Sequence, residues 1–379
     1  MELDKSTPVL PYHRIVVKLG TNLLTAGTGK LDLQIMAVLV SQIAALQGKG
    51  KEVTVVSSGA IAAGRKKLGL RGERKDIPFK QVLASIGQSS LMSAYEQLFD
   101  WHGITVAQAL LTRADLSNRL GYLNARNTLL SLMELKVICI VNENDVVATE
   151  ELRGARFGDN DNLSAQVANL VDADLLVILT DIGGLYTGDP HKNPTASLIP
   201  RVDKIDAKLF RIAGGPVKGG GTGGMVTKLE AAKLATASGV GVIIAGGRIP
   251  DVLIRIASGE SIGTFFAPGS TRIESRKRWM LSGLACCGKV VIDDGAAAAL
   301  RKQNKSLLPS GISTVQGEFS RGDIVEIFNG ENRCIGFGIS SYSSGDIQAI
   351  KGAHSQKISA LLGHEYGSEV IHRNNLVIL

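Results

Sequence analysis

A glycine-rich segment, GGPVKGGGTGGMVTK at residues 214–228, carries the strongest chemical signal in the sequence. Seven of its fifteen residues are glycine, and an amphipathic helical pattern follows directly. Glycines let backbone N–H groups approach phosphate oxygens, and the N-terminus of a helix adds a favourable dipole. No G-x-x-x-x-G-K-[ST] motif fits, and no strand precedes the G-x-G-x-x-G of Gly219, Gly221 and Gly224. The segment is either a flexible surface loop or, as the nearby Lys228 favours, a phosphate cradle.

A second candidate is Lys18, which lies in the otherwise apolar run RIVVKLG at residues 14–20. An unpaired ammonium group is costly to bury, so this side chain either reaches solvent or meets an anion. Gly20 follows where a parallel strand would end, and α/β sheets bind ligands at that edge. Further polar clusters follow other apolar runs, at Ser57–Ala60, Asn142–Asp145 and Thr180–Asp181. Each cluster alone could be a turn, but together they favour an active site.

The third candidate is GDNDN at residues 158–162, which opens the helical pattern LSAQVANLV. Asp and Asn are preferred N-caps, but one helix needs only one such residue. The additional acidic and amide side chains suit the positioning of lysines, a metal shell or a substrate ammonium group.

These parts together indicate phosphoryl transfer, because lysines and backbone donors stabilise the charge of a transferring phosphoryl group. No general base is evident: the six histidines are scattered outside the strand-end clusters, and no G-x-S-x-G motif occurs. A carboxylate acceptor, with a pKa near ~4, is already ionised at neutral pH and needs no base. The sequence therefore favours a kinase that forms an acyl phosphate over one that phosphorylates a hydroxyl group.

The elements that would position these residues alternate between strands and helices as far as about residue 269. Continuous Val/Ile/Leu runs predict strands that are covered on both faces, as in a parallel sheet. These runs are 14–20, 52–58, 104–111, 136–144, 174–181 and 241–246. Helical patterns lie between them at 31–47, 78–99, 115–135, 161–171 and 226–238. This order predicts a three-layer αβα domain with a mainly parallel central sheet, interrupted by a surface excursion at 187–200.

The pattern changes after residue 270. The charged stretch 270–279 reads as a linker, and shorter strands follow at 288–293, 322–329, 333–341 and 369–379. Small helices are expected at 295–302, 344–351 and 355–362. We therefore expect a kinase-type domain over 1–270, a linker over 271–284 and a small mixed-β domain over 285–379.

Composition excludes several classes of protein. No window reaches 18 uninterrupted apolar residues, and MELDKSTPVLPYHR lacks the basic and then apolar order of a signal peptide. Four cysteines without C-x-x-C make neither a disulfide framework nor a zinc site. We expect a cytoplasmic protein without a membrane span.

The net charge of +7 raises the alternative of nucleic-acid binding. All of the excess is local, at +5 in residues 62–80 and +3 in 272–278, whereas the remainder sums to −1 and residues 279–379 are neutral overall. RNA recognition relies on basic groups and stacking aromatics, so RNA binding by the C-terminal part is unsupported. The basic stretch 62–80 is either a solvated face or a regulatory or intersubunit surface.

Several motifs closely resemble the glutamate 5-kinases of the amino-acid kinase superfamily. They are VVKLGT (16–21), SSGAIAAGR (57–65), LLTRAD (110–115), VNENDVVAT (141–149), GDNDNLSA (158–165), LLTDIGGLYTGDP (179–190) and GTGGMVTKLEAA (221–232). The C-terminal part resembles a PUA domain in LLPSGI (307–312), FSRGDIVEI (319–327) and HSQKISALLGHEYGSEVIHR (354–373). One departure is EELRGARF (150–157), which is longer than the family pattern.

The resemblance implies roles for individual residues. Lys18 and Lys228 would stabilise the transferring group, and Asp161 would orient both lysines. The implied ATP-binding residues are Lys18, Thr180, Asp181, Thr222, Gly223, Gly224, Met225, Val226, Thr227 and Lys228. The implied glutamate-binding residues are Ser58, Asp145 and Asn160, with Asp159 as a further partner. Gly20 and Gly59 would offer backbone N–H groups to the phosphoryl oxygens.

The resemblance also implies Mg²⁺ held mainly by the ATP phosphates, with L-glutamate as acceptor and γ-glutamyl phosphate as product on the route to proline. It implies a homo-oligomer and feedback inhibition by L-proline. Acidic residues at the acceptor site suit a free ammonium group, so N-acetylglutamate and UMP rank below glutamate. On the physics alone, an aspartate or carbamate kinase stays open.

Overall fold

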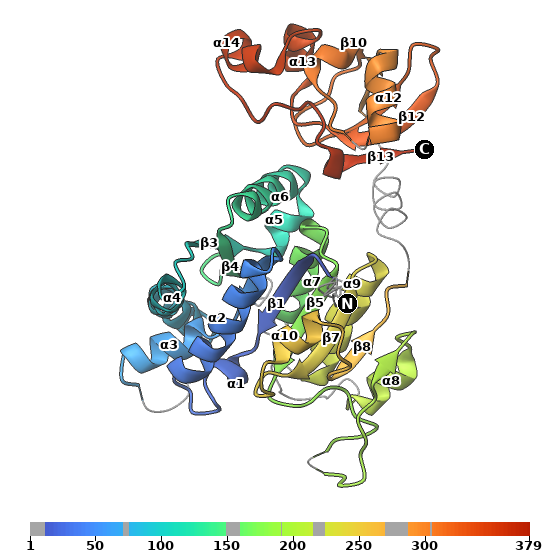
Figure 1. Cartoon of the computed structure of the whole chain (residues 1–379). Helices are drawn as coiled ribbons and strands as arrows, with labels where there is room; N and C mark the ends of the chain where they lie inside the picture. Colours follow the sequence, from blue (N-terminus) through green and yellow to red (C-terminus); the bar gives the residue numbers. More distant parts are fainter. Residues whose placement is uncertain are drawn as a thin grey trace, which may run out of the picture. The chain divides into compact units, whose positions relative to one another are not determined.

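The chain folds into two structural units (Figure 1). The computed structural model describes residues 12–70, 76–148, 160–190, 192–214, 224–269, 287–303 and 305–379. One unit comprises Met1–Leu116 and Ala125–Arg272, and the other comprises Ser117–Asn124 and Ile273–Leu379. The expected linker, 271–284, lies outside the described residues, so the domain boundaries stay a prediction.

The centre of the first unit is a sheet with the strand order β3-β4-β2-β1-β5-β7-β8-β6 in the described residues. The six predicted strands are β1 Arg14–Leu19, β2 Glu52–Ser57, β3 Val106–Leu111, β4 Ile138–Glu143, β5 Leu175–Thr180 and β7 Gly241–Gly246. They pair in parallel, as their continuous apolar runs predicted. Two short strands, β6 Arg201–Val202 and β8 Thr264–Phe266, extend the sheet, with β8 antiparallel to β7. The predicted fold class is confirmed.

Helices cover both faces of this sheet (Figure 1). The described helices between residues 21 and 257 are α1 Thr21–Leu24, α2 Leu33–Gly48, α3 Ala60–Lys67, α4 Ile77–Asp100, α5 Arg113–Ser117, α6 Arg119–Glu134, α7 Asn160–Leu170, α8 Ala207–Ile212, α9 Met225–Ala237 and α10 Val252–Ala257. In the described parts of the chain, no helix is both long and apolar enough to cross a membrane.

The alternation of β1 decides where Lys18 points. Ile15, Val17 and Leu19 belong to the apolar core that includes residues of α2, α4 and α10. Successive side chains of a strand face opposite sides of the sheet, so Val16 and Lys18 face the other layer. That layer contains α7, which packs against β1 and β5 and lies alongside α9.

Local sequence explains how the main helices begin. Asp32 caps α2 by accepting hydrogen bonds from the N–H groups of Gln34 and Ile35, and Asp76 caps α4 by accepting from Phe79. The residue that directly precedes α9 is Gly224, which has no side chain to cap the helix. The first-turn N–H groups of α9 are therefore not satisfied by a capping side chain.

The second unit is built on a mixed sheet with the order β10-β9-β11-β12-β13. The strands are β9 Gly288–Ile292, β10 Ile312–Gln316, β11 Ile324–Phe328, β12 Cys334–Ile339 and β13 Leu376–Ile378, and the helices include α12 Asp294–Gln303, α13 Ser344–Ile350 and α14 Ile358–Leu362. Strand β11 is parallel to β9, and the other pairs are antiparallel. The sequence did not predict β10, because ISTVQ is an edge strand with mostly exposed polar residues.

Candidate active site

One buried carboxylate connects two lysines that come from different elements. The Lys18 ammonium on β1 lies 2.5 Å from Asp161 Oδ1, and the Lys228 ammonium on α9 lies 3.2 Å from Asp161 Oδ2. Lys18 is 3% exposed, Asp161 0% and Lys228 6%. Charged groups this deeply buried persist only when they are paired and hydrogen-bonded. The structure thus brings together the three residues predicted to be catalytic.

The fold explains why these three side chains meet. Lys18 points towards the α7 layer, Asp161 is the second residue of α7, and Lys228 lies in the first turn of α9. A carboxylate near the N-terminus of a helix is stabilised by the helix dipole. Because α7 and α9 pack side by side, their N-termini and the end of β1 form one site.

The first turn of α9 adds backbone donors to this site. Gly224 precedes the helix, and the N–H groups of Met225, Val226 and Thr227 have no acceptors within it. The Thr227 hydroxyl lies 2.8 Å from the Gly224 carbonyl oxygen and 3.0 Å from Asp161 Oδ2. Such a turn beside two lysines suits a phosphate group. Of the predicted ATP-binding loop, Thr222 and Gly223 lie outside the described residues.

Thr180 and Asp181 lie where β5 ends. The Thr180 hydroxyl donates to Asp181 Oδ1 at 2.9 Å, and the Asn22 side-chain amide donates to Asp181 Oδ2 at 3.2 Å. Burial alone would raise the pKa of Asp181. The two side-chain hydrogen bonds, a further hydrogen bond from the Asp181 backbone and the positive charge of Lys228 together outweigh burial and hold the pKa below its ordinary value. Asp181 is therefore ionised at neutral pH and lies within the electrostatic reach of Lys228.

The backbone requires glycine at only one of the two predicted positions, Gly59, because Gly20 has an extended backbone and an added β-carbon there would make ordinary contacts. The Gly20 N–H donates to the Leu179 carbonyl oxygen at 3.4 Å, and a β-carbon added at Gly20 would lie 3.8 Å from the Lys18 ammonium. Gly59 precedes α3 with a φ of 106°, a conformation that favours glycine. The backbone thus approaches Lys18 closely at Gly20. The phosphoryl contacts of both glycines stay a prediction.

The predicted glutamate-binding residues Ser58 and Asn160 are in contact. The Asn160 Nδ2 group donates to the Ser57 carbonyl oxygen at 2.7 Å, to Ser58 Oγ at 3.1 Å and to Asn142 Oδ1 at 2.8 Å. The Asn160 Oδ1 atom is buried and has no hydrogen-bond partner among the described residues. Asn160 therefore holds a buried acceptor atom that no described residue uses, in a side chain that contacts Ser58.

Asp145 follows β4, and the Gln81 side-chain amide donates to its backbone carbonyl oxygen at 3.0 Å. Burial raises the pKa of the Asp145 carboxyl group from 3.8 to about 6. A cation that binds beside this carboxyl group would stabilise its ionised form. Asp159, the further predicted partner, lies outside the described residues.

Sequence reasoning did not assign roles to three residues around this pocket. The Asn142 side chain joins Asn160 to Gln88 of α4, and the Ser57 hydroxyl lies 2.8 Å from the Tyr95 hydroxyl. Burial raises the pKa of Tyr95, so this hydroxyl keeps its proton. No signal in the sequence distinguished Gln88 or Tyr95, because α4 contains many other polar residues.

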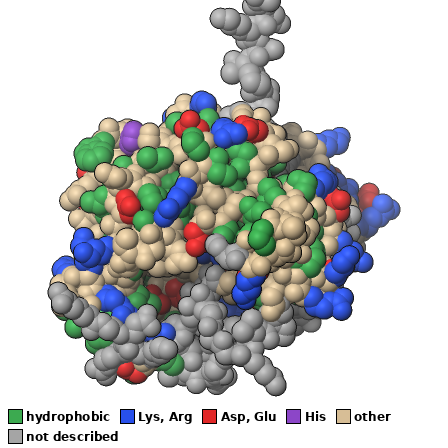
Figure 2. Space-filling model, turned by 90° about the horizontal axis from the view of Figure 1, so that it is seen from below, with side chains coloured by type: hydrophobic (Ala, Val, Ile, Leu, Met, Phe, Trp, Pro, Cys, Tyr) green, Lys and Arg blue, Asp and Glu red, His purple; other side chains and the backbone are tan. Residues whose placement is uncertain are grey.

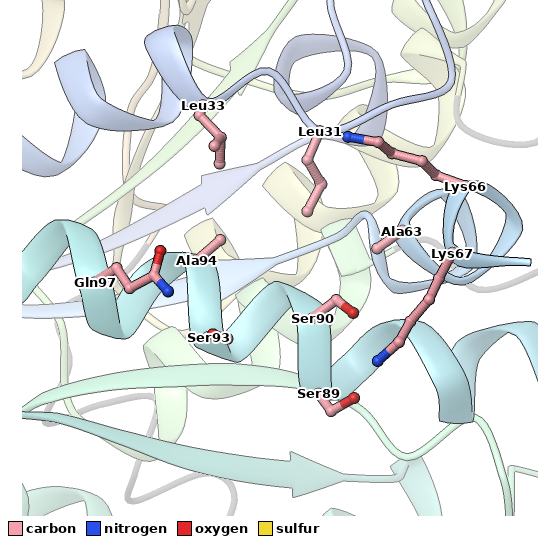
Figure 3. A pocket seen from close by; sticks show the side chains of 10 residues that line it. All are labelled: Leu31, Leu33, Ala63, Lys66, Lys67, Ser89, Ser90, Ser93, Ala94 and Gln97. Carbon is pink, nitrogen blue, oxygen red and sulfur yellow. The ribbon is translucent and has the colours of Figure 1, made fainter.

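A separate groove of about 520 Å³ lies between α3, α4 and the residues that precede α2 (Figure 3). Lys66 and Lys67 of the basic stretch 62–80 line it, together with Ser89, Ser90 and Gln97. None of the predicted site residues lines this groove. It is therefore separate from the cluster of hydrogen-bonded side chains around Ser58 and Asn160.

Two family models match the chain, the amino acid kinase family over residues 13–246 and the PUA domain over residues 288–362. The chain belongs to the amino acid kinase family. Within it, the chain is 60% identical to a glutamate 5-kinase of Dehalococcoides mccartyi strain CBDB1, over 97% of this chain and 99% of that relative. Glutamate 5-kinases of Photobacterium profundum (51% identical, 99% and 98% covered) and Herpetosiphon aurantiacus (49%, 97% and 98%) match similarly.

The family match confirms both predicted resemblances, to the amino-acid kinases and to the PUA domain. The match to the amino acid kinase family covers residues 13–246 and therefore includes every predicted site residue from Lys18 to Lys228. Among solved structures, UMP kinase from Bacillus anthracis aligns with a TM-score of 0.48 and 19% identity, covering 69% of this chain and 98% of that chain.

Proposed function

We propose that this chain transfers the terminal phosphoryl group of ATP to the γ-carboxylate of L-glutamate, which is the first step of proline biosynthesis. The observation that carries the proposal is the bridge from Asp161 to Lys18 and Lys228, adjacent along α7 to the acceptor that Asn160 presents. The glutamate 5-kinases that match nearly the whole chain support the choice of glutamate.

On the phosphate side, the two lysines stabilise the charge that spreads over the transferring group. Their ammonium groups are held by one carboxylate, so they need little reorganisation when the reaction occurs. The first-turn N–H groups of α9 add donors for the phosphate oxygens, while Thr180 and Asp181 face the nucleotide. Asp161 is a positioning residue here, because it acts through Lys18 and Lys228.

On the acceptor side, the ammonium group of glutamate binds to the Asp145 carboxylate and to Asn160 Oδ1. Ser58 offers a hydroxyl group beside them. The γ-carboxylate is then free to attack the terminal phosphorus of ATP, and ADP leaves. The acceptor is ionised before it binds, so no residue needs to remove a proton.

Mg²⁺ fits this site as an ion carried by ATP. Hard oxygen ligands such as phosphates, waters and one or two carboxylates suit Mg²⁺. The described residues contain no group of three or more His, Cys, Asp or Glu side chains that could hold a metal. The ionised Asp181 is the carboxylate we propose to contribute a ligand, and the ion would neutralise phosphate charge.

The substrate is tested by ATP-dependent formation of the acyl hydroxamate, with glutamate, aspartate and N-acetylglutamate compared as acceptors. We expect glutamate to give the highest kcat/KM by at least about tenfold, because a free ammonium group meets Asp145 and Asn160. A higher kcat/KM for N-acetylglutamate or aspartate would overturn the assignment.

The pH dependence of kcat/KM for glutamate tests the role of Asp145. Its pKa of about 6 means that the carboxylate loses its charge as the pH falls through about 6. We expect kcat/KM to fall about tenfold per pH unit below that point, because the parameter reports groups of the free enzyme. In Asp145→Asn this fall should disappear, and kcat/KM at pH 8 should be low.

The same substitution, Asp145→Asn, should have the opposite effect on folding stability, because it should lower kcat/KM but raise the free energy of unfolding. A carboxyl group with a raised pKa opposes folding once it is ionised, so its contribution to stability is lost as the pH rises through about 6. Asp145→Asn should therefore be more stable than the wild type at pH 8, by about 1–3 kcal/mol, and lose that advantage at pH 4. A variant that is less stable at pH 8 would show that Asp145 has a structural role instead.

We further propose that the protein is a cytoplasmic homo-oligomer that L-proline inhibits, as the resemblance implies. RNA binding is not favoured. Residues 279–379 carry no net charge. Figure 2 shows the molecule from below the view of Figure 1, and on this other face basic side chains are interspersed with acidic and apolar ones. Sedimentation with and without proline, alongside the activity assay, tests both the assembly and the inhibition.

A further inference from the structure

Three polar side chains of α4, each seven residues from the next, contact strand ends that carry the proposed acceptor-binding residues. Seven residues are two helical turns less about 20°, so such residues share one face. Each of the three reaches a strand end that carries acceptor-site residues: Gln81 reaches the Asp145 carbonyl oxygen at 3.0 Å, Gln88 reaches Asn142 at 2.8 Å, and Tyr95 reaches Ser57 at 2.8 Å.

Backbone groups fix the direction of the hydrogen bonds in the middle of this row. The Glu143 N–H lies 2.9 Å from Asn142 Oδ1, and because it can only donate, that atom must be the amide oxygen. The Asn142 nitrogen therefore faces α4, where it donates to Gln88 Oε1 at 2.8 Å. Gln88 acts as an acceptor and must keep its oxygen towards Asn142.

The same reasoning orients Asn160. The Ser57 carbonyl oxygen can only accept, so the Asn160 atom at 2.7 Å is the amide nitrogen. That nitrogen also donates to Asn142 Oδ1, which the Glu143 N–H and Gln88 already hold in place. The Asn160 oxygen is left buried without a partner in the described residues. A buried acceptor in this state costs free energy until a donor reaches it.

We propose that Gln88 is a positioning residue of the acceptor site, which sets substrate affinity without touching the substrate. It anchors Asn142, and Asn142 in turn holds the Asn160 amide with its oxygen towards the ammonium group of the amino acid. The proposal rests on the proposed function, because the donor it invokes is the ammonium group of a free amino-acid acceptor.

The packing of α4 shows why Gln88 can serve as an anchor. The preceding residue, Gly87, lies so close to α3 that an added β-carbon would be 1.8 Å from the Ala60 carbonyl oxygen. An added β-carbon at Gly64 of α3 would be 1.9 Å from the Leu83 carbonyl oxygen of α4. The two backbones are in direct contact, so α4 cannot move closer to α3 and is packed against it as one rigid pair. A site supported by rigid elements keeps its geometry.

A second detail of Gln88 argues against a role in packing alone. Its Nε2 group is buried and has no hydrogen-bond partner among the described residues. An unsatisfied buried donor is unfavourable, and an apolar side chain of the same length would avoid it. The benefit of glutamine at this position therefore lies in its oxygen, which accepts from Asn142.

The test compares Gln88→Met with the matched control Gln97→Met. Gln97 is on the same helix but lines the open groove (Figure 3). We expect Gln88→Met to raise KM for glutamate about tenfold or more while kcat and KM for ATP change by less than about twofold, because it removes the acceptor for Asn142. Gln97→Met should match the wild type. Equal glutamate KM values in all three proteins would overturn the proposal.

A double substitution separates positioning from structure. In an Asn142→Ala background, Gln88→Met should raise KM for glutamate no further, because its effect passes through Asn142. Additive effects of the two substitutions would overturn the proposal. If Gln88→Met does not fold, Asn142→Ala alone decides: an unchanged KM for glutamate rejects the mechanism.

Failure of this proposal can be told apart from failure of the proposed function. The variants are assayed with whichever acceptor the wild type prefers among glutamate, aspartate and N-acetylglutamate. Preference for aspartate would reject glutamate as the substrate and leave the expected KM effect at Gln88 in force. Preference for N-acetylglutamate, or no product from any acceptor, would reject both, since neither outcome involves a free ammonium group.

Discussion

Lys228→Met should lower kcat about 10²- to 10³-fold and leave the fold intact. The ammonium group lies 3.2 Å from Asp161 Oδ2 in the first turn of α9, beside the backbone donors that suit a phosphate. Removing one fixed donor from a site that stabilises developing charge costs this much in well-studied enzymes. Methionine keeps the apolar stem of the side chain, so packing in the 6% exposed position is largely preserved.

Stability should change little in Lys228→Met, because Asp161 keeps its 2.5 Å contact with Lys18. The matched control is Lys233→Met, an exposed lysine on the same helix. Steady-state kinetics should show a fall in kcat for Lys228→Met that exceeds any change in its KM for glutamate, and no change in either parameter for Lys233→Met. A Lys228→Met enzyme with the wild-type kcat would remove this lysine from the mechanism.

The adjacent residues Asn160 and Asp161 divide the two halves of the site between them. Successive residues of a helix point about 100° apart, so one side chain reaches Ser58 and the other reaches the lysines. The N-terminus of α7 thus fixes the separation between the proposed acceptor site and the proposed phosphoryl site. Substitutions at Asn160 should act mainly on KM for glutamate, and substitutions at Asp161 mainly on kcat.

Much of this arrangement could be predicted from the sequence, because single residues contradicted their local pattern. Lys18 in an apolar strand had either to reach solvent or to meet an anion, and GDNDN contained more polar residues than a helix cap needs. The continuous apolar runs predicted parallel strands, whose carboxyl ends meet at one edge. The identity of the partner, Asp161, came from the family resemblance and not from the pattern.

The support of the pocket could not be predicted in this way. Gln88 and Asn142 are 54 residues apart, and helical periodicity shows which side chains share a face but not what that face contacts. The raised pKa of Asp145 depends on burial by surrounding elements. Strands as short as β6 and β8 carry too few residues to show a period.

Asp161→Asn should reduce both activity and stability, and nucleotide should restore part of the stability. The substitution leaves Lys18 and Lys228 facing a neutral amide in a buried site. Removing one partner of a buried ion pair costs about 3–5 kcal/mol in free energy of unfolding. The exposed pair of Asp203 and Arg201 gives the control, because Asp203→Asn should cost only about 0–1 kcal/mol.

The stabilisation by a bound nucleotide shows whether Asp161 positions the two lysines for phosphate or only packs against them. In Asp161→Asn, the phosphates of a non-hydrolysable ATP analogue supply the negative charge that the lysines have lost. A saturating analogue should therefore raise the free energy of unfolding more in Asp161→Asn than in the wild type, although kcat stays low because the lysines are no longer held in one geometry. Urea denaturation with and without the analogue measures the difference. Equal stabilisation of both proteins would mean that the phosphates do not approach Lys18 and Lys228, and the assignment of the phosphoryl site would be wrong.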